Sequence, residues 1–235
     1  MNKLEFLGRG SGYNVAEGNT CAFLKKDDTL LLIDCGEAIF EKVVRMDLIN
    51  GIKNVHVLIT HMHSDHIGSL GSFVGYCYWK SKIKTNIYFN EKEKIGEFLK
   101  LTGAIKDESF TLYDTYNKRI DNLNLTFNAS LTKHAKTVNT YSLLLKFDYG
   151  NDIFYSGDTY ETNIDVIAYL KAGNLIYHDT CLNDCEGNVH TSLRVLSDKI
   201  PYEYRKQVYC IHIDGENFIE KATEKGFNVV QTILA

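Results

Sequence analysis

The stretch Ile59-Thr60-His61-Met62-His63-Ser64-Asp65-His66-Ile67-Gly68 places three histidines and one aspartate within six residues. It follows an apolar run and precedes apolar residues at a helical spacing, so we expect a strand to end here and a helix to begin. In extended or tightly turning backbone, alternate side chains point the same way. His61 and His63 can therefore converge on one point, while Asp65 and His66 reach a neighbouring point.

These side chains suit two divalent cations that lie side by side. Neutral imidazole and carboxylate are ligands that zinc, iron and manganese accept, and paired metals that share a water lie roughly 3.5 to 4 Å apart. The alternative interpretation is a polar loop whose histidines are merely solvated. The strand and the helix that flank the motif favour the metal site, because a motif counts only in the right structural context.

The motif resembles the HxHxDH signature of the metallo-β-lactamase superfamily of hydrolases. The upstream segment Leu31-Leu32-Ile33-Asp34-Cys35-Gly36-Glu37 is similar to the strand end that precedes this signature in the ribonuclease Z branch. The resemblance extends over nearly the whole chain. It implies an α/β fold, the four-layer αββα sandwich, with both metals held between the edges of its two sheets.

Length and composition are consistent with one soluble enzyme domain. A chain of 235 residues with 44% hydrophobic content can bury a full core, so we expect a single domain over residues 1–235. The formal net charge of −4 provides no global attraction to a polyanion or a membrane. No run of 18 apolar residues is present, and Glu5 and Gly8 interrupt the first hydrophobic segment, so we expect a cytoplasmic protein.

Alternation and periodicity predict a chain of mixed strands and helices. The predicted strands are 4–7, 21–25, 29–33, 55–59, 86–89, 110–113, 123–127, 141–147, 152–155, 175–177, 208–212 and 229–233. The predicted helices are 37–50, a signature helix that runs to about Lys82, 91–101 with Asn90 as its cap, 162–171 and 217–225. We assign strands 110–113 and 123–127 to the second half of the fold. The glycine-rich stretch 8–12 lacks the Lys-Ser/Thr of a phosphate-binding loop, and we interpret it as a turn that passes close to the metal site.

Three residues outside the signature match further ligand positions of the family. His134 follows a strand-like segment and matches the family's third histidine, and Asp158 lies on a tight turn and matches the bridging aspartate. His212 ends a strand where family members carry the last ligand of the second metal. The resemblance thus implies one metal on His61, His63 and His134, a second metal on Asp65, His66 and His212, and Asp158 between them.

The resemblance also implies a general acid. The segment His178-Asp179-Thr180-Cys181 resembles the HEATF-like segment of ribonuclease Z relatives, and His190-Thr191-Ser192 resembles their HST segment. In those relatives the histidine donates a proton to the leaving oxygen and the acid orients it. The predicted catalytic residues are therefore His190, Asp179, which replaces the relatives' glutamate, and Asp65. We interpret His56 as a structural histidine, and His178 as a residue that either packs or supports the ligands of the site.

These residues predict a metal-dependent hydrolase, with phosphodiesters as the favoured substrates. Two bridged cations lower the pKa of a water from 15.7 to roughly 7, which provides a hydroxide nucleophile at neutral pH. A general acid such as His190 is needed where the leaving group is a poor alkoxide, as in a phosphodiester. We expect two divalent metal ions, zinc in the first place, with manganese or iron as alternatives because the ligands accept several metals.

The spacing between the later ligands bears on the substrate. Ribonuclease Z clamps transfer RNA with a long arm between the third histidine and the bridging aspartate, whereas His134 and Asp158 are only 24 positions apart here. We therefore expect a small phosphodiester, such as a cyclic nucleotide, a cyclic phosphate or a short oligonucleotide. Long nucleic acids and membranes are not expected partners, and a homodimer is what the resemblance suggests.

Other classes remain open at this point. A thioester or lactam hydrolase would use the same metals without His190 as an acid. A transfer RNA 3′-processing endonuclease and a non-catalytic binding module with the same fold are further alternatives. A di-iron flavoprotein oxidoreductase would carry glutamate in place of His63. Cys181 and Cys185 lack the CxxC spacing of a metal or redox pair, and we interpret them as ordinary thiols.

Overall fold

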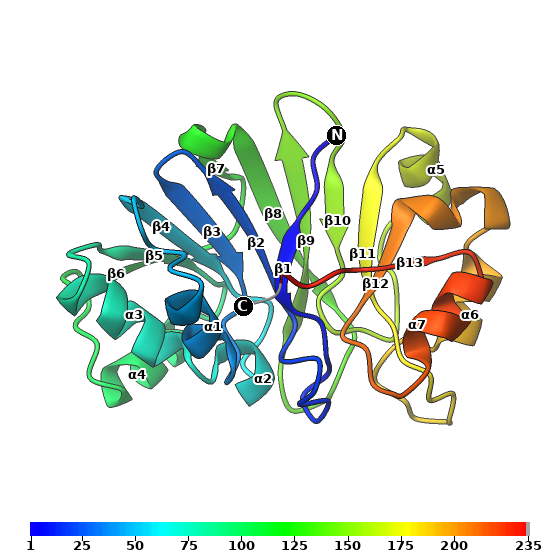
Figure 1. Cartoon of the computed structure of the whole chain (residues 1–235), viewed down its shortest axis with the longest axis horizontal. Helices are drawn as coiled ribbons and strands as arrows, with labels where there is room; N and C mark the ends of the chain where they lie inside the picture. The colour runs from blue at the N-terminus through cyan, green and yellow to red at the C-terminus, as the bar shows by residue number, and fades with distance from the viewer. Residues whose placement is uncertain (234–235) are drawn as a thin grey trace.

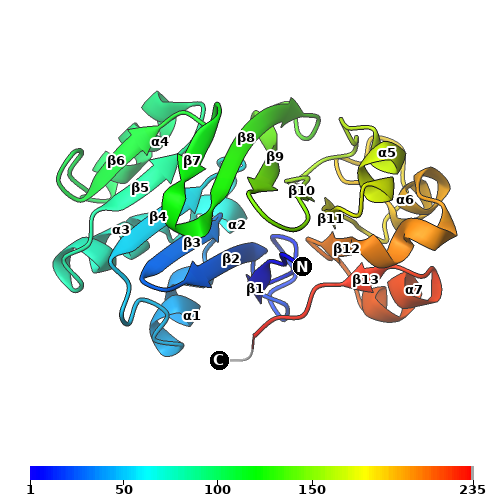
Figure 2. The same ribbon diagram turned by 90° about the horizontal axis from the view of Figure 1, so that it is seen from above.

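Two β-sheets stack face to face in the computed structural model, which describes residues 1–233. The helices α1 to α4 cover the outer face of one sheet, and α5 to α7 cover the outer face of the other (Figures 1 and 2). This is the four-layer αββα sandwich that the sequence predicted. Both sheets are mixed, and both end in parallel strands whose carboxyl ends carry the residues of the predicted site.

The first sheet has the strand order β1-β2-β3-β4-β5-β6. Its strands are β1 (Glu5–Gly8), β2 (Cys21–Lys26), β3 (Thr29–Ile33), β4 (Asn54–Leu58), β5 (Thr85–Tyr88) and β6 (Phe110–Tyr113). The first three strands pair antiparallel, and β3 to β6 pair parallel. The helices on its outer side are α1 (Ile39–Arg45), α2 (Ser64–Ile67), α3 (Leu70–Trp79) and α4 (Lys92–Leu101).

The second sheet has the strand order β13-β12-β11-β10-β9-β8-β7. Its strands are β7 (Lys118–Ile120), β8 (Leu125–Thr132), β9 (Thr140–Phe147), β10 (Ile153–Tyr155), β11 (Leu175–Asp179), β12 (Val208–Ile211) and β13 (Asn228–Val229). Its outer helices are α5 (Val166–Lys171), α6 (Leu193–Lys199) and α7 (Phe218–Glu224), and two 3₁₀ turns span Asp121–Leu123 and Tyr202–Gln207. Strands β10 to β13 pair parallel.

The strand β3 shows why the central strands are continuous apolar runs. Leu30 and Leu32 pack against the helices, while Leu31 and Ile33 pack between the sheets. Successive side chains of a strand point to opposite faces, and both faces of β3 are covered, so every residue of this strand is buried. Apolar side chains fill the space between the two sheets and the space under each helical layer.

Two predictions about the first half of the chain were wrong in detail. The predicted helix 37–50 is helical only as α1, because the chain turns after Arg45 and Asp47 adopts a positive φ of 50°. The signature helix is two helices, α2 and α3, separated at Gly68 and Ser69. The hydroxyl of Ser69 accepts a hydrogen bond from the Phe40 backbone and donates one to the Gly36 carbonyl. These bonds connect the break between α2 and α3 to the segment that follows β3.

Further corrections concern caps and strand placement. Asn90 does not cap α4; its side-chain oxygen accepts hydrogen bonds from the backbone and the hydroxyl of Thr115. The predicted strand 110–113 is β6, the edge of the first sheet, and so does not belong to the second half. The predicted helix 162–171 begins only at Val166, where the Asp165 carboxylate caps it. Only Val229 of the predicted strand 229–233 lies in a strand, the two-residue β13.

The contact between Gly36 and the signature loop gives a stability prediction. A methyl group added at Gly36 would overlap the backbone carbonyl of Asp65, and neither backbone can move without shifting the site. We expect Gly36→Ala to lower the free energy of unfolding by about 1 to 3 kcal/mol, the usual cost of overpacking. Urea denaturation measures this loss.

Gly75→Ala is the matched control for Gly36→Ala. Gly75 lies inside α3 and a methyl group there would meet nothing within 4 Å, so alanine should stabilise the helix by about 0.5 to 1 kcal/mol. Equal stability of the Gly36→Ala variant and the wild type would contradict the tight packing of the strand end on the signature loop.

Candidate metal centre and active site

The seven predicted metal ligands come from loops at the carboxyl ends of four strands. His61, His63, Asp65 and His66 lie in and just after the loop between β4 and α2. His134 follows β8, Asp158 follows β10 and His212 follows β12. Figure 1 shows that these strand ends meet at one end of the sandwich, beside α2.

The structure brings all seven predicted ligands together in two neighbouring groups. The donor atoms within each group lie within 4.8 Å of one another, and the groups are His61, His63 and His134, and Asp65, His66, Asp158 and His212. Asp158 Oδ2 lies 3.3 Å from His212 Nε2 and 3.4 Å from His66 Nε2. The same oxygen lies 3.8 Å from the Nε2 atoms of His61 and His134, so this carboxylate lies between the two groups.

Hydrogen bonds fix the orientation of the imidazole rings. His66 Nδ1 donates to Asp34 Oδ2 at 2.8 Å, and His134 Nδ1 donates to the Val189 carbonyl at 3.0 Å. In each ring the opposite nitrogen then faces the cluster that the seven predicted ligands form. This is the usual arrangement around a metal-binding histidine. His66 Nε2 is buried and has no hydrogen-bond partner among the described residues. A buried nitrogen of this kind, aimed at two carboxylates, fits a divalent metal ion.

The pKa of His61 also fits metal binding. Burial lowers the pKa of His61, and the charge of His66 lowers it further, so His61 is in the neutral form that binds metal. Burial alone would raise the pKa of Asp158, but the charges of His212 and His66 outweigh it and lower that pKa. Buried carboxylates require positive charge nearby, and divalent cations held by this donor set would supply it.

Asp34 supports the site, although the sequence analysis assigned it no role. Its buried carboxylate accepts hydrogen bonds from His66 Nδ1, from the Thr60 backbone at 2.8 Å and from the Thr60 hydroxyl at 2.7 Å. Asp34 also has a positive φ of 65°, a strained conformation for a residue other than glycine. The sequence contains a feature that could have predicted this role, because Asp34 belongs to the segment that resembles the strand end of ribonuclease Z.

His190 and Asp179 form a hydrogen-bonded pair at the edge of the cluster. His190 Nδ1 donates to Asp179 Oδ2 at 2.7 Å, so the aspartate reaches the histidine although the relatives carry the longer glutamate. Asp179 is fully buried, and its other oxygen lies 3.5 Å from His212 Nδ1. Burial lowers the pKa of His190, but the Asp179 charge and hydrogen bond outweigh burial and raise that pKa above its ordinary value.

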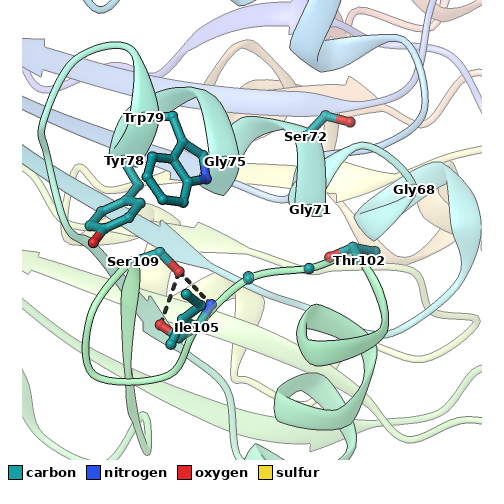
Figure 3. Close-up of a pocket in the computed structure, with 11 residues that line it drawn as sticks. Gly68, Gly71, Ser72, Gly75, Tyr78, Trp79, Thr102, Ile105 and Ser109 are labelled. Atoms are coloured by element: carbon teal, nitrogen blue, oxygen red, sulfur yellow. Dashed lines mark hydrogen bonds between the residues drawn. The ribbon is translucent and has the colours of Figure 1, made fainter.

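The cluster opens into a cleft of about 670 Å³, large enough for a small substrate. His63, Asp65, His134, His190 and His212 lie in its wall. A smaller cavity of about 270 Å³ lies between α3 and the segment after α4 (Figure 3). None of the predicted site residues lines that cavity, so the cleft at the cluster is the candidate active site.

The remaining histidines and the cysteine pair lie outside the two ligand groups. His56 Nδ1 lies 3.0 Å from the Tyr88 hydroxyl, and the buried His178 bonds the Thr162 hydroxyl and its neighbour's carbonyl. Cys181 and Cys185 are free thiols and belong to no group of potential metal ligands within residues 1–233. Over the same residues, no helix is long and apolar enough to cross a membrane.

The fold defines the class of protein: the chain has the metallo-β-lactamase fold, as the sequence predicted. Residues 2–232 match the family described as Anti-Pycsar protein Apyc1, and the chain belongs to that family. It is 28% identical to the Anti-Pycsar protein Apyc1 of Paenibacillus harenae over 89% of this chain and 88% of that protein. Its identity to the protein of the same name from Bacillus phage 010DV004 is 25%, over 95% and 93% of the two chains.

Solved structures show the same fold at low sequence identity. The metallo-β-lactamase fold protein YhfI from Bacillus subtilis has a TM-score of 0.74 at 15% identity, over 98% of this chain and 97% of that chain. A diphosphatase from the PhnP family has a TM-score of 0.73 at 18% identity, over 98% and 95%. The short form of human tRNase Z has a TM-score of 0.70 at 16% identity, over 98% and 97%.

Proposed function

We propose that this protein is a metal-dependent phosphodiesterase that acts on small phosphodiesters, with cyclic nucleotides as the favoured substrates. The observation that carries the proposal is the pair of His190 and Asp179 beside the cluster. A thioester has a leaving group that departs without a proton, whereas the alkoxide of a phosphodiester requires one. A histidine held by a buried carboxylate at the wall of the cleft supplies that proton.

The residues of the site divide the chemistry between them. We assign the seven ligands of the two groups to two divalent cations, which would stabilise charge on a phosphoryl oxygen and lower the pKa of a water between them. Asp65 contributes one of these ligands, and its Oδ2 lies 3.2 Å from Nε2 of His212, another ligand of the same group. Asp179 holds the Nδ1 proton of His190, so the Nε2 proton of the charged imidazole is the one available to a leaving oxygen.

The short segment between the predicted ligands His134 and Asp158 supports a small substrate. The segment from His134 to Asp158 consists of β9, β10 and short connections, with no inserted arm. The positively charged arm that holds transfer RNA in ribonuclease Z therefore has no counterpart there. The curated relatives carry the name Anti-Pycsar, and we propose that this chain shares the role that the name states. A small cyclic phosphodiester fits both the cleft and the missing arm.

A substrate screen with metal analysis tests the proposal. The purified full chain is loaded with zinc or manganese, its metal content is measured, and it is assayed on 3′,5′-cyclic nucleotides, bis-p-nitrophenyl phosphate and a thioester. We expect about two metal ions per chain and turnover of the phosphodiesters. Turnover of the thioester alone, or no turnover of any phosphodiester by metal-loaded protein, would overturn the proposal.

The raised pKa of His190 predicts how activity depends on pH. A general acid must carry its proton, so kcat on a cyclic nucleotide should fall as the pH rises through the pKa of His190. Asp179→Asn removes the charge that raises this pKa, so the fall should move to lower pH. At neutral pH we expect a loss in kcat of roughly 10- to 100-fold, as for other residues that orient a reacting histidine.

Asp198→Asn is the control for the pH profile. Asp198 lies on α6, is exposed and pairs with Arg194 at 3.0 Å. Its pH profile should match that of the wild type. An unchanged profile in Asp179→Asn would show that Asp179 does not set the proton affinity of His190.

A further inference from the structure

The connection between β1 and β2 presents two unpartnered apolar side chains at the cleft. Tyr13 and Val15 are 101% and 86% exposed, and both line the cleft that holds the cluster. Figure 1 shows this connection beyond the ends of the sheets, beside α2. An exposed side chain on its own is ordinary. An aromatic ring held at the mouth of a polar active site is a candidate contact for the substrate.

Hydrogen bonds hold this connection against the metal centre. The Ser11 backbone and the Asn14 side chain both donate to the Ile213 carbonyl at 3.0 Å, and Ile213 directly follows His212. The Arg9 guanidinium pairs with Glu17 at 2.7 Å and closes the base of the connection. The position of Tyr13 is thus fixed relative to a predicted metal ligand.

Gly12 brings the connection close to the second ligand group. A methyl group at Gly12 would lie 3.0 Å from Asp65 Oδ2, so the backbone passes directly beside this carboxylate. A side chain at this position would require the Asp65 carboxylate to shift by a few tenths of an ångström. The next residue, Tyr13, therefore projects from a point adjacent to the cluster and not from a distant surface loop.

Two polar side chains elsewhere in the wall of the cleft are already engaged. Asn188 Nδ2 donates to the Asn183 carbonyl at 2.7 Å, and Asp214 accepts from the Leu182 backbone at 2.8 Å. These hydrogen bonds hold the connection between β11 and α6 in place. The cleft thus combines a charged floor at the cluster with a mouth where Tyr13 and Val15 offer apolar surface.

We propose that Tyr13 is a stacking platform for the nucleobase of the substrate, with Val15 extending the apolar surface. This inference rests on the proposed function, because the phosphate must lie at the cluster for the base to reach the mouth of the cleft. The base is the large flat part of a cyclic nucleotide, and an aromatic side chain stacks on any base. Tyr13 thereby determines specificity and takes no part in the proton transfer.

Binding and turnover of matched compounds test the proposal. The substrates are a 3′,5′-cyclic nucleotide and the same ribose cyclic phosphate with a methoxy group in place of the base. The Rp-phosphorothioate of each compound is used to measure equilibrium binding by calorimetry. For Tyr13→Ala we expect KM for the nucleotide to rise roughly 5- to 150-fold, the range typical of base stacking on an aromatic ring, with a smaller change in kcat. The loss on the nucleotide should exceed the loss on the base-free compound at least about fivefold.

Two further variants sharpen the experiment. Tyr13→Phe keeps the ring and should keep the preference for the nucleotide over the base-free compound. Tyr149→Ala removes another exposed tyrosine, from the connection between β9 and β10 at the opposite end of the sheet, and should match the wild type.

The outcomes separate this inference from the proposed function. Tight binding of the phosphorothioate nucleotide that depends on Tyr13, without turnover of the parent compound, would support the platform and overturn the phosphodiesterase. Equal losses on the two compounds in Tyr13→Ala would overturn the platform. Conversion of a dimer to a monomer by Tyr13→Ala, again with equal losses, would assign the ring to a contact between two copies instead.

Discussion

Asp158→Asn is expected to remove phosphodiesterase activity almost completely and to reduce the metal content of the protein. The carboxylate lies between the two ligand groups, within 3.3 to 3.8 Å of four histidine nitrogens. Asparagine has the same shape but no negative charge, so it cannot offset the repulsion between two adjacent cations. Loss of one neutral donor to a transition state costs about 10² to 10³ in kcat, and we expect this charged residue to cost at least about 10³.

Metal content and thermal unfolding are the measurements for Asp158→Asn. After dialysis the wild type should hold about two metal ions per chain and the variant fewer. Added zinc should raise the melting temperature of the wild type more than that of the variant, since a ligand stabilises a fold in proportion to its affinity. This comparison also shows that the variant is folded.

Asp148→Asn serves as the control for Asp158→Asn. Asp148 is exposed, pairs with Arg119 and lies just after β9, at the end of that strand away from the cluster. It should leave both metal content and activity unchanged. Full metal content together with normal activity in Asp158→Asn would contradict the assignment of this carboxylate to both metals.

The strands were more predictable from the sequence than the helices. Residues 29–33 are apolar because β3 is covered on both faces, and its limits were predicted without error. Helix α1 was predicted too long, because Met46 and Ile49 continue the helical spacing while the chain turns at Asp47. The break between α2 and α3 depends on contacts of Ser69 with residues more than 25 positions away, which no local pattern reports.

Some residues of the candidate site were also more predictable from the sequence than others. His61, His63, Asp65 and His66 lie close in sequence, so their spacing alone suggested a shared site. His134, Asp158 and His212 are scattered, and only the resemblance to a family connected them to the signature. The support from Asp34 and the position of Tyr13 depend on tertiary contacts, through His66 and Ile213 respectively. Spacing within the chain carries no information about such contacts.

His190→Ala should lower kcat on a 3′,5′-cyclic nucleotide by about 10² to 10⁴, the range typical of a general acid. The effect should depend on the leaving group. A ribose alkoxide requires a proton, whereas p-nitrophenolate is a stable anion and departs without one. We therefore expect only a small loss on bis-p-nitrophenyl phosphate, and the ratio of the two losses is the measurement that identifies the acid.

Metal content determines how the result for His190→Ala is interpreted. His190 also lies close enough to His134 and Asp158, and to Asp179 and His212, to be a metal ligand. If it is a general acid, the variant should keep about two metal ions per chain and the strong dependence on the leaving group. If it is a ligand, the variant should lose metal and lose activity equally on both substrates. That result would contradict the acid, because His190 would then bind a cation with the nitrogen that the leaving oxygen needs.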